Sequence, residues 1–238
     1  MPRPFAILRQ RLWYSAIRRV LPKGPTGRGW YLADEVARLA GISSKQVGRW
    51  ASTGLIRSSQ ASGASRAYSF EDVAEAIIVH ELVRRGVPRR EIRNVVARTR
   101  KGWGEWPLTN APLVTSETGG GISKVLLHDD DDYYDIGDRG SDQGWAYPQD
   151  VSQVVDLLGK GGWVILEYPE ITRVEVHPDL LGGTPTVRGH RVPVSLAAEL
   201  GRDPDGREIL HDDYDLTDPE IDDAVKWEEA SSKFVRAA

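Results

Sequence analysis

The chain of 238 residues contains no cysteine, a single methionine and five histidines. Without cysteine there are no disulfides, thiol nucleophiles, cysteine-ligated zinc ions or iron–sulfur clusters, and the composition fits a reducing compartment. The histidines are scattered and never form an HxxxH pair, so their spacing does not predict a metal site. We therefore expect neither a metal nor another cofactor.

Long apolar runs are also missing. No stretch approaches the roughly 18 apolar residues that a membrane helix requires. Residues 1–29 are basic, and arginines interrupt their apolar positions, so they lack the continuous apolar region of a secretory signal. We expect these residues to form an amphipathic helix and a linker of prolines and glycines, in a cytoplasmic protein with no membrane partner.

The formal net charge of −4 conceals two halves of opposite sign. Residues 1–106 contain 20 lysines and arginines and 8 acidic residues, whereas residues 107–238 contain 11 and 27. Such an asymmetry indicates that one half faces a polyanion and that the other half faces a basic partner or solvent. The basic excess coincides with a DNA-binding pattern, which mere solubility does not explain.

That pattern lies within residues 30–106, which we predict to be a winged helix-turn-helix domain. Ala37 and Gly41 stand four residues apart. A small side chain at the first position lets two helices cross closely, and a glycine at the second supplies the turn.

The second helix of this motif begins at residues 43–46 (SSKQ), which have the spacing of a capping box. Val47 and Trp50 are expected to be buried. Lys45 and Arg49 lie four residues apart and therefore share the opposite face. The N-terminal residues of such a helix enter the major groove of DNA.

A wing of two strands is expected next, the first beginning at Leu55–Ile56 and the second ending at Tyr68. Small polar residues and a glycine between them make a flexible tip. Arg57 and Arg66 flank this tip, where they can reach phosphates or a minor groove.

Two longer helices complete the domain. The first starts at the cap signature of residues 69–72 (SFED) and ends near Arg85, and the second starts at Pro88. The second has a basic outer side formed by Arg89, Arg90, Arg93, Arg98, Arg100 and Lys101.

The strings EVARLAGIS, RW, GLI and RAYSFEDV, in this order and spacing, resemble the MerR-type winged-helix family over residues 30–98. The resemblance implies sequence-specific binding of operator DNA through the second helix and the wing. Relatives continue into a long dimerisation helix, whereas here the pattern breaks at residues 102–107 (GWGEWP). We still expect a homodimer, held elsewhere, because operators usually pair two half-sites. The predicted DNA contacts are Ser43, Ser44, Lys45, Gln46, Arg49, Arg57, Arg66 and Tyr68.

Residues 107–121 are interpreted as a linker and residues 122–173 as a small α/β module. In this module we expect a strand at 124–128 paired with 133–136, a helix at 151–158 and an extended segment at 163–166. The acidic run Asp129–Asp132 lacks the alternating ligands and glycine of a calcium loop, so a solvated loop is favoured.

Residues 174–238 are predicted to form a β-hairpin around Arg188–Gly189, a helix from Ser195, and two helices joined by a turn at Asp215. The strings HPDLLGGTPTVRGHRVPV and ILHDDYDLTDPEIDDAVKWEE resemble a small family of unknown function that is often described as VapB-type antitoxins. The resemblance implies DNA binding for autoregulation and neutralisation of a PIN-domain ribonuclease toxin.

The sequence thus predicts an α+β protein with three functional hypotheses. The leading hypothesis is the antitoxin of a type II toxin–antitoxin module, with Lys233 and Arg236, placed beyond the last helix, as candidate toxin contacts. The alternative is a MerR-like transcriptional regulator with a ligand-sensing C-terminal region. An enzyme is disfavoured, because no nucleophile and base stand in a catalytic arrangement.

Overall fold

The computed structural model describes residues 31–62, 65–117, 123–129, 132–136, 148–150, 170–177 and 180–236. Within these residues the fold is α+β, as predicted. The predictions for residues 1–29, 151–158 and 163–166 lie outside the described residues.

The helix-turn-helix consists of α2 (Ala33–Ala40) and α3 (Ser44–Ser52). Gly41 ends α2 with φ of 66°, a left-handed conformation that suits glycine, and the Ile42 amide donates to the Ala37 carbonyl at 3.1 Å. The Ser43 hydroxyl accepts a hydrogen bond from the Gln46 amide at 3.2 Å and so caps α3. These contacts confirm the predicted turn and the serine half of the capping box.

The wing is a two-stranded antiparallel ribbon of β1 (Gln60–Ser62) and β2 (Ser65–Ala67), with Gln60 opposite Ala67. The strand predicted at Leu55–Ile56 is wrong, because these two side chains are buried within the turn that leaves α3. Tyr68 lies beyond β2 and forms a bridge with Tyr31, in which each amide donates to the other's carbonyl.

Two longer helices lie behind the helix-turn-helix, α4 (Phe70–Arg84) and α5 (Arg89–Trp103). Ser69 and Asp72 form a reciprocal capping box at the start of α4. The end of α5 at Gly104, where φ is 80°, confirms that the helix stops where the sequence pattern breaks.

A four-stranded antiparallel sheet follows, in the order β5-β4-β3-β6. The short helix α6 (Pro107–Asn110) leads into it. Its strands are β3 (Leu113–Glu117), β4 (Ser123–Asp129), β5 (Asp132–Asp135) and β6 (Pro148–Asp150).

This sheet corrects one prediction and confirms another. Residues 107–117, interpreted as part of a linker, form α6 and an inner strand, and Leu108 and Leu113 are buried. The pairing expected between 124–128 and 133–136 is present, with Leu126 opposite Asp135. Prolines and glycines around the segment suggested a linker, but its apolar side chains pack into the core.

The C-terminal part begins with a two-stranded ribbon of β7 (Val174–Glu175) and β8 (Thr186–Val187), separated by η1 (Leu181–Gly183). The hairpin predicted around Arg188–Gly189 is reduced to one bridge, between Thr186 and Pro193, because β8 pairs with β7.

Three helices complete the chain, namely α8 (Val194–Leu200), α9 (Pro204–Tyr214) and α10 (Asp218–Arg236). Asp215, with φ of 54°, ends α9 in the left-handed conformation and makes the predicted turn. Lys233 and Arg236 lie inside α10, which corrects their placement beyond the last helix.

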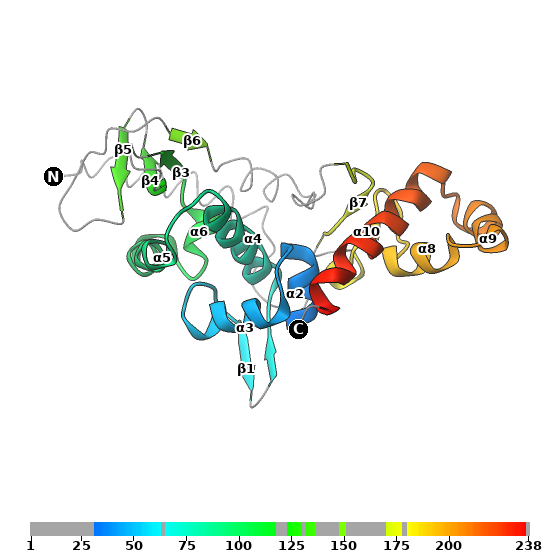
Figure 1. The fold of residues 1–238 in the computed structure, drawn as a ribbon, viewed down its shortest axis with the longest axis horizontal. Helices are drawn as coiled ribbons and strands as arrows, with labels where there is room; N and C mark the ends of the chain where they lie inside the picture. The colour runs from blue at the N-terminus through cyan, green and yellow to red at the C-terminus, as the bar shows by residue number, and fades with distance from the viewer. Residues whose placement is uncertain are drawn as a thin grey trace.

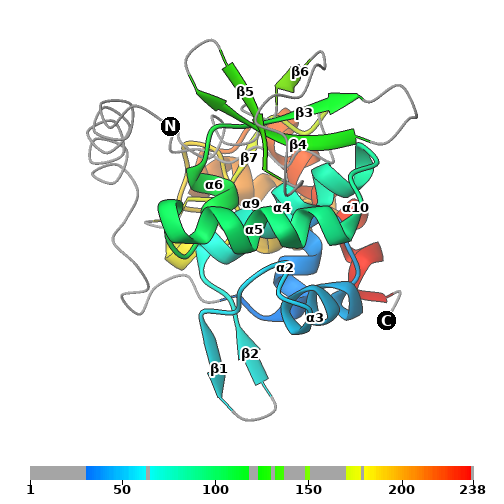
Figure 2. The same ribbon diagram turned by 90° about the vertical axis from the view of Figure 1, so that its left-hand side faces the viewer.

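The two parts of the molecule meet where α10 packs against α2 (Figures 1 and 2). The sheet lies at one end of Figure 1, α8 and α9 lie at the other, and α3 and the wing lie at the lower side. Buried side chains from both parts, including Tyr31, Val174 and Trp227, belong to one continuous core. No described helix is long and apolar enough to cross a membrane.

Candidate nucleic-acid interface

The outward face of α3 carries the central predicted contacts. Lys45 and Arg49 are exposed, whereas Val47 and Trp50 on the opposite face are 0% and 1% exposed. The buried pair fixes the helix on the core and thereby aims the two cations at solvent. The first turn of α3 adds the partial positive charge of a helix N-terminus, which favours phosphate.

Ser43, Ser44 and Gln46 lie at the beginning of the same helix. Ser43 is engaged as the cap, and the Ser44 hydroxyl donates to Asp34 Oδ1 in α2. Both serines and Gln46 are half-buried. These three residues therefore lie at the less exposed edge of the surface that carries Lys45 and Arg49.

Arg66 ties the wing to α3. Its Nη1 donates to the Gly48 carbonyl at 3.0 Å, and the residue remains exposed. This contact sets the angle between the ribbon and the helix, so the two can approach one duplex together.

Arg57 lies at the base of the wing and contacts the loop that follows α5. It forms an ion pair with Glu105, and its guanidinium carbon lies 5.6 Å from the centroid of the Trp106 ring. The break in the α5 pattern thus has a structural role, because the loop that replaces a longer helix holds the wing arginine.

Tyr68 does not face solvent. It is 1% exposed, and burial raises the pKa of its hydroxyl, although Arg66 opposes this shift. The prediction of a direct DNA contact does not fit this burial. Tyr68 instead anchors the end of the wing to the core through its bridge with Tyr31.

Two buried carboxylates, Asp72 and Glu75, hold the loop before the wing and the segment after α5 in place through contacts that the sequence did not predict. Asp72 Oδ2 accepts from the amides of Ser59 and Ser69 at 2.7 and 2.9 Å, and Oδ1 accepts from the Trp106 indole at 2.9 Å. Asp72 was predicted only as a cap of α4. No local signal identifies its two partners outside the capping box.

Glu75, one turn further along α4, is 0% exposed. Its Oε1 accepts from the Leu108 amide at 2.8 Å, while Oε2 has no hydrogen-bond partner. Burial raises the pKa of this carboxyl to about 8, and the charge of Asp72 adds to the shift. Glu75 is therefore largely protonated at neutral pH.

Long-range contacts of two residues, Arg38 and Tyr31, join the C-terminal part to the helix-turn-helix. Arg38 of α2 pairs with Glu228 at 2.5 Å, donates to Ser231 at 3.1 Å, and lies 4.7 Å from the Trp227 ring centroid. The buried Tyr31 hydroxyl donates to the Gly183 carbonyl at 2.8 Å. These contacts place α10 beside the DNA-binding motif.

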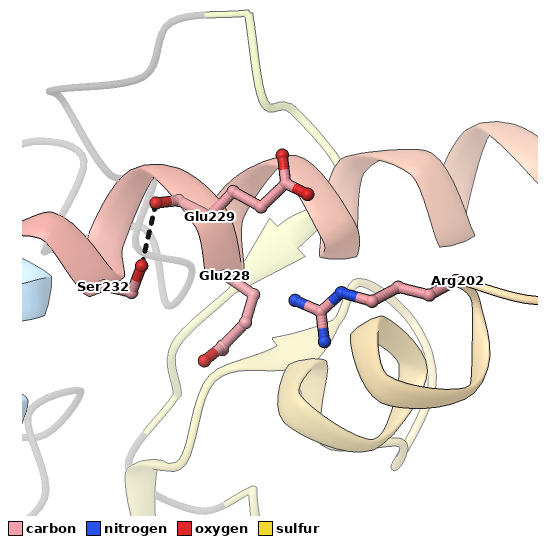
Figure 3. A pocket seen from close by; sticks show the side chains of 4 residues that line it. All are labelled: Arg202, Glu228, Glu229 and Ser232. Atoms are coloured by element: carbon pink, nitrogen blue, oxygen red, sulfur yellow. Dashed lines mark hydrogen bonds between the residues drawn. The ribbon is translucent and has the colours of Figure 1, made fainter.

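An open hollow lies between α10 and the turn from α8 to α9 (Figure 3). It is lined by Arg202, Glu228, Glu229 and Ser232, and the Ser232 hydroxyl donates to the Glu229 carbonyl at 3.0 Å. Its charged lining differs from the largely apolar pockets that hold small molecules. Trp145, Tyr147 and Trp163, whose aromatic rings are candidates for lining a ligand pocket, lie outside the described residues. The described residues contain no cluster of three potential metal-binding side chains.

Comparison with known families identifies two domains. Residues 31–99 match the MerR HTH family regulatory protein model, and residues 174–227 match the model of a protein of unknown function, DUF433. The chain therefore carries a MerR-type helix-turn-helix domain, as predicted, and a DUF433 domain.

Similar proteins include two uncharacterized HTH-type transcriptional regulators, from Mycobacterium bovis and Mycobacterium tuberculosis. Each is 35% identical over 92 residues, which cover 37% of this chain and 40% of the relative. The chain thus spans about 40% of the length of these curated relatives.

Among solved structures, the crystal structure of Rv2018 from Mycobacterium tuberculosis is similar in fold. It has a TM-score of 0.57 and 19% identity, and the match covers 82% of this chain and 96% of that chain. The likeness extends over both the helix-turn-helix and the C-terminal part, which supports the arrangement of the two.

Proposed function

We propose that this protein is a DNA-binding transcriptional regulator whose α3 reads the major groove of an operator. The observation that carries the proposal is the face of α3 within the MerR-type domain. There, Lys45 and Arg49 are exposed directly opposite the buried Val47 and Trp50. Lysine and arginine are the side chains that most often read guanine edges, and they also bind phosphates. The names of the mycobacterial relatives, which describe transcriptional regulators, support this function.

The test is DNA binding by single variants of the full chain. Lys45→Ala and Arg49→Ala should each weaken binding to a selected operator by about 1–3 kcal/mol if the side chain contacts a base edge. Arg202→Ala is the matched control, because Arg202 is exposed in the turn between α8 and α9, outside α3 and the wing. Equal affinities for all three variants and the wild type would remove α3 from the interface.

We further propose that two copies bind one operator as a homodimer. Operators usually contain two half-sites about 34 Å apart, one turn of the double helix, so a pair of α3 helices would bind them together. Since α5 ends at Trp103, the pairing surface lies outside the usual dimerisation helix. Light scattering of the protein–DNA complex should give two chains per operator, and one chain per operator would contradict the dimer.

A second, finer function is also proposed, namely neutralisation of a PIN-domain ribonuclease toxin. The observation that favours it is the outward face of α9, which lies far from α3 and the wing in Figure 1. This acidic face consists of the exposed residues Asp205, Glu208, Asp212 and Asp213, with Ile209 43% exposed among them. A nuclease that binds RNA has basic surface patches. An acidic face can cover these patches while α3 remains bound to DNA.

Co-expression with a PIN-domain ribonuclease toxin tests the toxin role. The wild type should co-purify with the toxin and suppress its ribonuclease activity, and the double variant Glu208→Lys with Asp212→Lys should lose both effects. Glu199→Lys, at an exposed position of α8, is the control. If no PIN-domain ribonuclease toxin binds, the toxin role is overturned and the role in regulation remains.

A further inference from the structure

The last helix, α10, ends beside the DNA-binding motif. Figures 1 and 2 give two perpendicular views, and in both the red C-terminal end of α10 lies next to α2 and at the level of α3. The beginning of α10, in contrast, lies close to α9, away from the wing. The helix therefore runs from beside α9 to α2, the first helix of the helix-turn-helix, and ends at the level of α3.

This end of α10 is held in place by packing. Arg38 of α2 contacts Glu228 and Ser231, and Ser231 is 0% exposed. Phe234, one turn further along, is half-buried and packs against the core. The last turns of α10 are thus fixed relative to α2, and through α2 relative to α3.

The charge of α10 changes along its length. Its earlier turns are rich in acidic side chains, ending with Glu228 and Glu229, whereas residues 230–236 contain Lys233 and Arg236 and no acidic side chain. Lys233 is exposed, and its Nζ lies 4.9 Å from the centroid of the Phe234 ring. A cation thus lies on the solvent side of α10 in the same turns that pack against α2.

We propose that the C-terminal end of α10 forms part of the DNA interface, with Lys233 contacting a backbone phosphate beside the base pairs read by α3. This inference rests on the proposed DNA-binding function and extends it to the end of α10, beyond the residues that match DUF433. Phosphate contacts fix the register of a protein on the duplex, so α10 would help to position α3. The end of α10 and α3 would then bind DNA as one surface.

A simpler role for Lys233 makes a different prediction. Cations near the end of a helix interact favourably with its partially negative carbonyl groups. If Lys233 has only this role, its removal lowers the melting temperature and leaves DNA affinity unchanged. A phosphate contact instead changes both the affinity and its dependence on salt.

The experiment compares Lys233→Ala with Lys226→Ala in the full chain, by fluorescence anisotropy on a selected operator at several salt concentrations. Lys226 is exposed on the same helix, seven residues earlier. At 1.5 Å per residue it lies about 10 Å further from the end of the helix. Lys233→Ala should weaken binding on the order of fivefold at 0.1 M salt and reduce the salt slope by about 0.9, while Lys226→Ala should match the wild type. Lys233→Arg should retain the contact.

The outcomes separate the two proposals. If the wild type selects no operator, DNA binding itself fails. If the wild type binds, Lys45→Ala weakens binding and Lys233→Ala behaves like Lys226→Ala, the role of α10 is overturned and that of α3 remains. Melting temperatures of all variants show whether each one is folded.

Discussion

At the scale of single residues, the DNA-binding motif depends on buried polar groups whose partners are distant in sequence. Tyr31 is the first described residue, and its hydroxyl donates a hydrogen bond to the carbonyl of Gly183 in the other domain. Burial is the main cause of a raised pKa of this hydroxyl, with contributions from Glu35 and Glu71. The tyrosine is therefore a neutral donor at any ordinary pH.

Tyr31→Phe should lower the free energy of unfolding by about 1–3 kcal/mol, because it leaves the buried Gly183 carbonyl without its donor. Gly183→Ala should destabilise more, since the added Cβ would clash with the Tyr31 hydroxyl and φ at this position is +86°. Urea denaturation measures both changes. Gly189→Ala, where φ is also positive but the space is open, separates backbone strain from the clash.

Glu75 gives the protein a predictable response to pH. Its carboxyl has an ordinary pKa of 4.5 and a pKa of about 8 in the folded protein. The folded state thus binds this proton more tightly than the unfolded state does. The stabilisation that the protonated carboxyl contributes is complete below about pH 4.5 and is lost as pH rises through about 8. The slope within this window should be on the order of 1 kcal/mol per pH unit.

Glu75→Gln keeps the acceptor for the Leu108 amide and cannot ionise. Its unfolding free energy should therefore lack this pH dependence and should exceed that of the wild type at pH 8.5. Thermal melts of both proteins between pH 5 and 9 check the prediction. Parallel curves for the two proteins would show that Glu75 does not titrate in this range.

At the scale of elements, the wing and α3 form one unit because Arg66 joins them. Arg66→Ala should loosen the ribbon, so hydrogen exchange of the Gln60–Ala67 amides should accelerate and DNA affinity should fall. Arg66→Lys, which can donate only from a point-like amino group, should restore part of the effect. Unchanged exchange in Arg66→Ala would mean that the ribbon is held by the Tyr31–Tyr68 bridge alone.

The second important contact between elements is the packing of α10 against α2. Arg38→Ala removes an ion pair, a hydrogen bond and a contact with Trp227, and should lower the unfolding free energy by about 1–3 kcal/mol. Arg84→Ala, which removes an exposed ion pair with Glu81, should change it by less than about 1 kcal/mol. Chemical denaturation distinguishes the two variants.

At the scale of the whole molecule, the predictable features were those with local signals. Gly41, Ser43 and Ser69 mark helix ends by their own chemistry, and the structure confirms the helices that they predict. Gly102 and Gly104 likewise predicted the end of α5. The charged face of α3 followed from helical spacing alone.

Features that depend on distant partners were not predictable. Nothing near Leu108 indicates that its amide bonds to Glu75, so the segment leading into the sheet was interpreted as a linker. Similarly, Arg38 gives no sign of its contact with Glu228, which brings the DUF433 domain onto the helix-turn-helix. The sequence suggested two separate halves, whereas the structure joins them through α2 and α10.

The central claim, that α3 reads DNA, is tested most directly by selection from random duplexes with the full-length wild type and the double variant Lys45→Ala with Arg49→Ala. The wild type should enrich one motif, and the double variant, folded by its melting temperature, should lose it. Enrichment of the same motif with the same affinity by both proteins would contradict the claim.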